Sequence, residues 1–398
     1  MSGLGPAPGQ APRLWNRQFI VLNLASFILY CNMAVFFRYV VFLGEQGIDR
    51  QRAGLLVGAF SLVGLVVRPL VSPLVTPANA RSWMVPSSAA LVAALLSYNL
   101  AGDFASWMVV RVLHGLVYVV AGVGVMAALV GCIPPGQSGR AFGVMGVATL
   151  LPYAVMPPLV GPLERALGGY LPLLNLTALA MLAIPPLLAL AGPVQGPGQA
   201  GGQGRLVAGD LTANLRQPGV AASLLVSLAL YCPFAAVFYL LDPISQSMGL
   251  GGVGLFFAAS TASEMVVRFL TGPLLDRLPK SPVLALAAAG LAGCFLLTPL
   301  VASTWHLAAL GLLFGAGWGV VLPLLNALLF DLSSPRLRAL NANLGMEMFQ
   351  GGFFLGPWLG GLMLAAAGPS GLLVGCAGTC LAAALAALGL PRPGKEKA

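Results

Sequence analysis

The chain has 398 residues, of which 58% are hydrophobic and only 8% carry a charge. A soluble domain carries about 25% charged residues, so most of this surface must face lipid rather than water. The net charge of +9 does not indicate a nucleic-acid partner, because the basic residues stand singly in short segments and form no patch. The sequence holds no metal-ligand cluster, phosphate-binding loop or nucleophile–base pair, so we expect neither an enzyme nor a bound cofactor or metal.

Apolar runs long enough to cross a bilayer as helices follow one another along the chain. Six lie at about 19–43, 53–72, 83–101, 105–131, 141–163 and 169–191, and six more at about 218–242, 252–275, 281–302, 304–330, 339–367 and 369–390. Residues 192–217 between the two sets are rich in Gly, Pro and Gln, a composition typical of a flexible linker. We therefore expect an all-α membrane protein of twelve transmembrane helices, arranged as two six-helix bundles at 17–191 and 218–390. Residues 1–16 should be disordered, and residues 391–398 should form a short tail.

The two halves repeat each other at an offset of 200 residues. The matching residues are Gly54 and Gly254, Arg68 and Arg268, Pro73 and Pro273, Pro157 and Pro357, and Gly161 and Gly361. Internal duplication with charges inside apolar helices is typical of secondary transporters, whose site lies between the halves near the middle of the bilayer. The sequence therefore predicts a membrane transporter.

Positive residues are distributed unevenly between the two sides of the predicted spans. Thirteen lie in the termini, the linker and the even-numbered loops: Arg13, Arg17, Arg81, Arg140, Arg205, Arg216, Arg277, Lys280, Arg336, Arg338, Arg392, Lys395 and Lys397. Three lie in the odd-numbered loops: Arg50, Arg52 and Arg165. Because cytoplasmic loops are enriched in Lys and Arg, we expect both termini and the linker in the cytoplasm.

Three short motifs resemble those of the major facilitator superfamily. The turn Gly272-Pro-Leu-Leu-Asp276-Arg277-Leu-Pro-Lys280 resembles the family's Gly-x-x-x-Asp-Arg-x-Gly-Arg turn, with a proline in place of the second glycine. Its earlier copy is degenerate, with Ser72, Thr76 and Pro77 in place of Gly, Asp and Arg. Arg111-Val-Leu-His114-Gly115 is similar to the Arg-x-x-x-Gly signature of proton-linked members. The exporter element Gly-Pro-x-x-Gly-Gly is only partly matched in the fifth helix, by Pro157 and Gly161, and is intact at Gly356–Gly361 in the eleventh.

The resemblance implies a secondary transporter similar to the drug and metabolite proton-antiporter branch, working as a monomer by alternating access. Its partners would be protons, a small-molecule substrate and the lipid of a plasma membrane, the inner membrane in a bacterium. Proton-coupled export of a small organic molecule agrees best with the motifs. Proton-linked import of a small anionic metabolite or a sugar is the alternative, because the fifth-helix element is incomplete and buried arginines suit an anion. A membrane-embedded enzyme or scaffold is the least favoured class.

Acidic residues inside the predicted spans are the candidates for proton coupling, since such charges are expensive in lipid and usually functional. Glu264 shares a helix face with Arg268; burial disfavours its charged form and an arginine favours it, so it is the first candidate. Glu347 shares a polar face with Asn343 and Gln350 and is the second. Each has a structural alternative, a static ion pair for Glu264 and an interhelical hydrogen bond for Glu347. His114 is either a proton relay or a packing residue.

The remaining candidates belong to a gate and to a substrate site. For the gate we expect Gly272, Asp276, Arg277 and Lys280, with Asp276 near a helix N-terminus or paired with an arginine, and Arg68 and Arg268 in symmetric gate or packing roles. The degenerate first copy of the turn predicts a latch that is weaker or replaced in that half. For the substrate we expect Arg38, Arg111, Asn32, Tyr30, Tyr153, Tyr231, Phe234, Trp318 and Gln350. Arg38 and Arg111 would bind an anion, unless they extend toward the outer interface.

Overall fold

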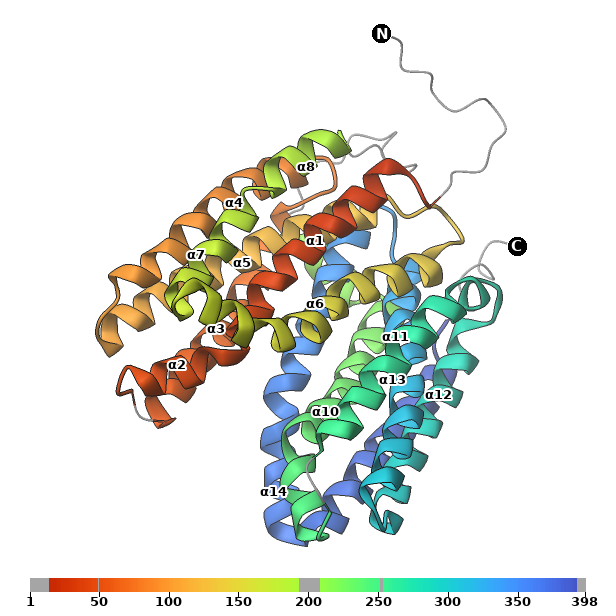
Figure 1. Ribbon diagram of the computed structural model, residues 1–398. Coiled ribbons are helices and arrows are strands. Elements are labelled where there is room, and N and C mark those ends of the chain that lie inside the picture. Colours follow the sequence, from red (N-terminus) through yellow and green to blue (C-terminus); the bar gives the residue numbers. More distant parts are fainter. Residues whose placement is uncertain (1–13, 49, 193–207, 251–252, 392–398) are drawn as a thin grey trace.

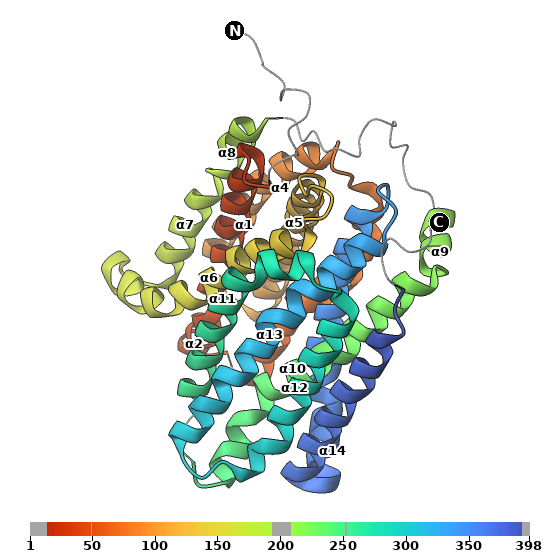
Figure 2. The same ribbon diagram turned by 90° about the vertical axis from the view of Figure 1, so that its right-hand side faces the viewer.

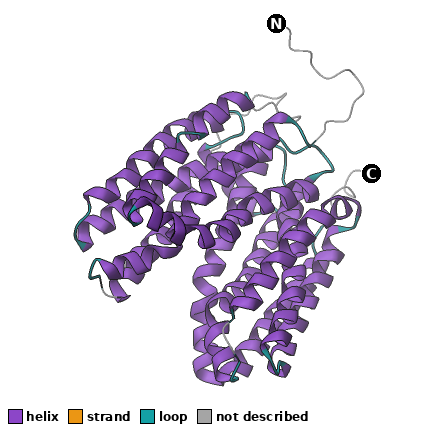
Figure 3. Cartoon of the chain, viewed as in Figure 1, coloured by secondary structure: helices purple, strands orange, loops and turns teal. Residues whose placement is uncertain are grey.

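The computed structural model describes residues 14–48, 50–192, 208–250 and 253–391. Most of the predicted disordered N-terminus, of the linker and of the C-terminal tail therefore lies outside the described residues. Within them the chain is helical and contains no strand (Figure 3). This agrees with the physics of a bilayer, where a helix satisfies its backbone hydrogen bonds within one segment. The prediction of an all-α membrane protein is confirmed for this part of the chain.

The first group of helices, which we call the N-terminal body, precedes residue 192. It contains α1 (Arg17–Val35), η1 (Phe36–Arg38), α2 (Tyr39–Glu45), α3 (Arg50–Val71), η2 (Ser72–Leu74), α4 (Ala80–Leu96), η3 (Ser97–Leu100), α5 (Phe104–Gly131), α6 (Ser138–Leu167), α7 (Tyr170–Met181) and α8 (Ile184–Ala191). The second group, the C-terminal body, contains α10 (Pro218–Ser247), α11 (Gly254–Arg277), α12 (Lys280–Leu297), η4 (Thr298–Leu300), α13 (Thr304–Leu332) and α14 (Arg338–Leu388). Between them lies α9 (Ala208–Leu215).

Helix breaks divide two of the predicted apolar runs, and a third break falls between two runs. The first run changes to a 3-10 turn at Phe36–Arg38, and the sixth is interrupted between α7 and α8. The last two runs are joined in α14, but the backbone at Gly368 is non-helical, with φ 67° and ψ −171°, and Pro369 follows. Glycine adopts this positive φ without the steric penalty of a side chain, so α14 is made of two helices that meet there.

Ten helices in the described part of the chain are long and apolar enough to cross a membrane. One of them is the whole of α14, and α11 is not among the ten. The sequence of α11 is more polar than its neighbours because it carries Glu264, Arg268 and four hydroxyl-bearing residues. A charged helix of this kind is stable in lipid only where its polar face is turned toward protein or a water-filled cavity.

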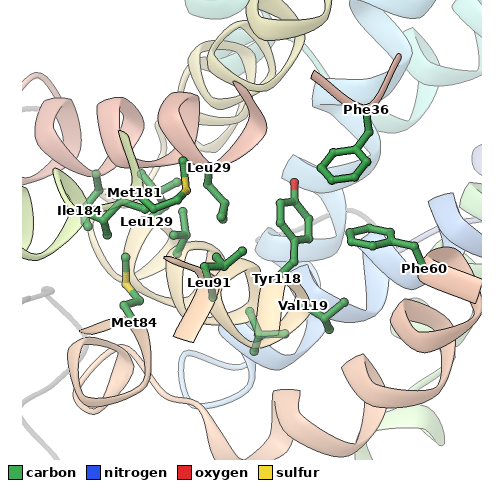
Figure 4. Packing of buried hydrophobic residues seen from close by; sticks show 14 of the residues in the cluster. Leu29, Phe36, Phe60, Met84, Leu91, Tyr118, Val119, Leu129, Met181 and Ile184 are labelled. Atoms are coloured by element: carbon green, nitrogen blue, oxygen red, sulfur yellow. The ribbon is translucent and has the colours of Figure 1, made fainter. Parts of the chain in front are cut away.

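The two bodies meet at the end of the molecule that carries the described termini and diverge toward the other end (Figure 1). The short helix α9 lies at the meeting end, next to α10 (Figure 2). Each has its own hydrophobic core. In the N-terminal body, Leu29, Leu91, Leu129 and Met181 from four different helices pack together (Figure 4). We call the end where the bodies meet the terminus-facing end. There, a few residues of α13 and α14, including Phe330, pack into the core of the N-terminal body.

Glycines allow α13 to lie directly on α11. Gly311, Gly315 and Gly319 follow at four-residue spacing and face the backbone of that helix. A Cβ added at Gly311 would lie 2.6 Å from the Phe256 oxygen, and one at Gly315 would overlap the Ser260 oxygen. Small residues at this spacing let membrane helices approach closely and pack by van der Waals contact. The close contact between α11 and α13 therefore positions the charged face of α11.

Candidate functional site

At the terminus-facing end, Asp276 of α11 binds the first turn of α6. Its Oδ1 accepts a hydrogen bond from the backbone N–H of Gly139 at 2.7 Å and another from that of Arg140 at 3.3 Å. These amides lie at a helix N-terminus, where N–H groups have no intrahelical acceptor and the helix dipole favours a negative charge. One turn earlier, a Cβ added at Gly272 would lie 3.3 Å from the Arg140 Cα. A carboxylate of one body therefore closes onto a helix end of the other.

The other predicted gate residues of this turn lie within the C-terminal body or on its surface. Arg277 is exposed at the end of α11. Lys280 pairs with Asp331 at 2.9 Å and so joins the start of α12 to the end of α13. In the degenerate first copy, Thr76 bonds only locally: its N–H donates to the Asn79 Oδ1 at 2.7 Å.

Deeper in the interface, Arg68 of α3 reaches two side chains of α14. Its Nε lies 3.5 Å from Glu347 Oε1, and its Nη1 donates to Asn343 Oδ1 at 3.4 Å. Arg68 and Glu347 are only 6% and 5% exposed. Neither carboxylate oxygen of Glu347 accepts a hydrogen bond from a described group. This is a buried pair held by charge alone, and it joins the two bodies.

The repeat-related arginine, Arg268, is arranged differently. It is buried and forms a close ion pair with Glu264, one turn earlier on the same helix. Across the interface it meets α6 at Gly146, where an added Cβ would overlap the guanidinium, and at Gly143, where a Cβ would lie 3.2 Å from its backbone oxygen. The predicted shared face of Glu264 and Arg268 is present, and the pair lies wholly within α11.

Arg111 and His114 lie inside the N-terminal body. The Arg111 side chain, 2% exposed, donates from Nε to the Leu56 carbonyl at 3.3 Å. His114 is fully buried, with Nδ1 3.2 Å from the Tyr98 hydroxyl and Nε2 3.1 Å from Asn32 Oδ1. Asn32 is likewise fully buried. Arg111, His114 and Asn32 are therefore buried within the N-terminal body, where their hydrogen-bond partners belong to that same body.

Arg38 lies at the far end of the N-terminal body. Its Nε pairs with Glu164 Oε2 at 2.8 Å, and Nη2 lies 3.6 Å from Glu45 Oε1. The side chain is 36% exposed and borders a cavity of about 510 Å³ with Gly161, Glu164 and Arg165. Arg38 therefore has carboxylate partners and is separated from the Arg68 and Arg268 pairs.

Aromatic side chains form most of the remaining predicted substrate site. In the N-terminal body, the rings of Tyr30 and Tyr153 meet edge to face at 6.3 Å, and Tyr153 is 46% exposed. In the C-terminal body, Tyr231 and Phe234 lie 6.4 and 4.6 Å from the ring of the fully buried Trp318. These contacts give each body one aromatic wall.

Gln350 lies between the bodies, because a Cβ added at Gly64 of α3 would lie 3.2 Å from its Nε2. It extends the polar face of Glu347 and Asn343 by one turn. Sequence reasoning missed the partners on the facing helices: the amides of Gly139 and Arg140, and the glycine at 146. Gly143 and Gly146 are one turn apart in α6. This spacing is the sequence signal that one face of α6 lies close to another helix.

Buried charges on apolar helices that face one another across two bodies define an integral membrane transporter rather than an enzyme. A family model described as the Major Facilitator Superfamily matches residues 22–344 and, in a second match, residues 252–398. The chain therefore belongs to the Major Facilitator Superfamily. Among curated proteins, no sequence matches it significantly.

Solved structures of the same fold are distant in sequence. The human organic anion transporter MFSD10 (TETRAN) is 16% identical, with a TM-score of 0.72 over 93% of this chain and 99% of the other. FucP in the outward conformation is 14% identical, with a TM-score of 0.70 over 94% of this chain and 100% of the other. A variant of the E. coli fucose:proton symporter FucP is 13% identical, with a TM-score of 0.72 over 94% and 99%. At these identities the likeness concerns the fold.

Proposed function

We propose that this chain is a proton-coupled exporter of a small organic molecule that works by alternating access, similar to the drug and metabolite antiporter branch of its family. The observation that carries the proposal is the pair of carboxylates, Glu264 and Glu347, at the interface of the two bodies. Among the acidic residues whose side chains the structure describes, they are the two that are buried. A carboxylate in this setting changes its charge when it binds or releases a proton, and an arginine lies beside each to bias that equilibrium.

The architecture we propose has twelve spans in two sets of six, with bundles at 17–191 and 218–390. The break at Gly368 supports this count by dividing α14, and the polar face of α11 explains why that helix is less apolar than the rest. The excess of Lys and Arg on one side supports cytoplasmic termini in a plasma membrane, the inner membrane of a bacterium. With that orientation, the bodies are closed toward the cytoplasm and diverge toward the outside. A monomer contains both bodies and suffices for the cycle.

The chemistry of the interface favours a neutral or cationic amphiphile as substrate. Arg68 and Arg268, the arginines at the interface, already have Glu347 and Glu264 beside them, so an anion would have to displace a carboxylate. The exposed ring of Tyr153 and the half-buried rings of Tyr30 and Phe234 are available for stacking and for cation–π contact. The buried Trp318 packs against Phe234 and Tyr231 and supports that part of the path. We therefore assign Tyr30, Tyr153, Phe234 and Gln350 to the substrate path, with Tyr231 and Trp318 as the rings that hold Phe234 in place.

A binding experiment tests the class of substrate. Purified protein is melted with ethidium, fluorescein or L-fucose, at one mildly acidic and one mildly basic pH. A ligand that binds only the folded protein at a hundredfold excess over its Kd adds about 2.7 kcal/mol of stability. Stabilisation by ethidium that depends on pH supports the exporter. Stabilisation by fluorescein or fucose instead would move the assignment to import of an anion or a sugar.

A transport experiment tests the coupling residue. In proteoliposomes with an imposed pH gradient, Glu264→Gln should abolish proton-driven movement of whichever probe binds, because a glutamine cannot carry the proton. The variant should still elute as a monodisperse protein. The matched control is Glu45→Gln, which removes an exposed carboxylate and should keep the parent rate. Normal proton-driven transport by Glu264→Gln would assign it a packing role and leave Glu347 as the coupling residue.

A further inference from the structure

The two arginines that occupy the same place in the repeat obtain their carboxylates from opposite sides of the interface. At the 200-residue offset, Glu264 corresponds to Gly64, and Glu347 corresponds to Val147. In the second half the carboxylate therefore stands on the helix of its own arginine, whereas in the first half it stands on the facing helix of the other body. Each arginine is therefore balanced by one carboxylate, but the Arg68 pair spans the two bodies and the Arg268 pair lies within one of them.

Separation of the bodies at the terminus-facing end affects the two pairs differently. When α3 moves away from α14, Arg68 loses both Glu347 and Asn343, because both partners belong to the other body. When α11 moves away from α6, Arg268 keeps Glu264 and loses only contact with the glycines of α6. One pair must break in each cycle, and the other moves as a unit.

The turn that closes the second half has no working counterpart in the first. Asp276 reaches across to the amides of Gly139 and Arg140, but Thr76 at the matching position bonds within its own turn to Asn79. The contact between α3 and α14 therefore depends on other interactions. Arg68 supplies them through its ion pair with Glu347 and its hydrogen bond to Asn343, and it lies eight residues before Thr76 in the sequence.

We propose that Arg68 and Glu347 form the second latch of the terminus-facing end, which replaces the degenerate turn of the first half and opens in every cycle. Removing a partner from a buried ion pair leaves an unpaired charge in an apolar setting, so the loss acts on the closed state. The inference rests on the alternating access of the proposed function, but not on proton coupling or on the identity of the substrate.

The test is a pair of double-mutant cycles read by the distance between the bodies. Spin labels are placed at Ala78→Cys and Ser334→Cys, two exposed positions at the terminus-facing end, on a background without the six native cysteines. Double electron–electron resonance gives the ratio of open to closed molecules. One cycle uses Arg68→Gln, Glu347→Gln and the double variant, and the matched cycle uses Arg268→Gln, Glu264→Gln and their double.

We expect coupling in the first cycle of roughly tenfold in the open-to-closed ratio, equivalent to about 1.4 kcal/mol, and none in the second. The charge-reversed variant Arg68→Glu/Glu347→Arg should return the short distance, and it serves as the test if a single variant aggregates. No coupling in the first cycle, equal coupling in both, or failure of the reversed pair to close would overturn the latch. Because no substrate is used, these outcomes are independent of the transport experiment.

Discussion

The guanidinium of Arg111 is buried beside aromatic rings instead of a carboxylate. Its Cζ lies 4.3 Å from the ring centroid of Phe36, 4.5 Å from that of Phe60 and 5.0 Å from that of Tyr39. A planar cation stacks on such faces and gains more than it would in water, because the site is desolvated. Phe36 and Tyr39 come from the broken end of the first span, so Arg111 also holds that break in place.

This arrangement predicts that Arg111→Lys destabilises the folded protein. An ammonium group keeps the charge but cannot stack on three rings, so we expect a loss of about 2 kcal/mol, visible as a lower melting temperature. Arg81→Lys, at an exposed position, should stay within about 0.5 kcal/mol of the parent. An unchanged melting temperature together with lost ligand stabilisation would instead place Arg111 in a substrate site.

Among the elements, α13 has glycines that lie directly against the backbone of a neighbouring helix, α11. A Cβ at Gly315 would overlap the backbone of α11, which has no side chain to move aside. Gly290 of α12 has no atom of another element within 4 Å of the same added carbon. Substitution of Gly315 therefore changes both helix packing and helix propensity, whereas substitution of Gly290 changes helix propensity alone.

We predict opposite effects of the same substitution at these two sites. Gly315→Ala should lower the apparent melting temperature by an amount equivalent to about 1–3 kcal/mol, since overpacking forces the helices apart. Gly290→Ala should leave it unchanged or raise it by up to about 1 kcal/mol through better helix propensity. Thermal unfolding in the same detergent measures both. Equal responses would show that the contact between α11 and α13 is looser than described.

Sequence patterns predicted the elements better than their partners. Apolar runs located the helices, and one-turn spacing placed Glu264 beside Arg268, because both depend on residues close in sequence. The partner of Arg68 is 279 positions away, and no local pattern encodes which helix faces α3. The three aromatic rings around Arg111 likewise come from separate helical segments, which no local pattern brings together. The break at Phe36–Arg38 contains no proline or glycine, so no local sequence signal predicts it.

At the scale of the whole molecule, the closed end depends on a carboxylate that caps a helix of the opposite body. Asp276 binds the amide hydrogens of Gly139 and Arg140 only while α11 lies against α6. In the alternating access that we propose, those amides are protected from solvent exchange while the bodies are in contact and released when they separate. Their exchange rate reports how often the bodies separate, independently of any substrate.

We predict that Asp276→Ala accelerates hydrogen exchange at Gly139 and Arg140 and slows turnover more than it weakens ligand binding. Loss of a charged acceptor at a helix N-terminus amounts to about 0.5–2 kcal/mol, or several-fold in exchange rate. Arg277→Ala, at the exposed neighbouring position, is the control and should leave the same amides protected. Loss of ligand binding with unchanged exchange would contradict a gating role.

The crossed placement of the carboxylates also bears on how a duplicated chain of this kind could have arisen. Two copies of the N-terminal body placed together would bury two arginines at these positions and no acid, because Gly64 and Val147 replace the glutamates. Two copies of the C-terminal body would bury two arginines and four glutamates. Only the heterologous pairing of one body with the other is neutral. Neither half therefore carries the charges that would balance a second copy of itself at this interface.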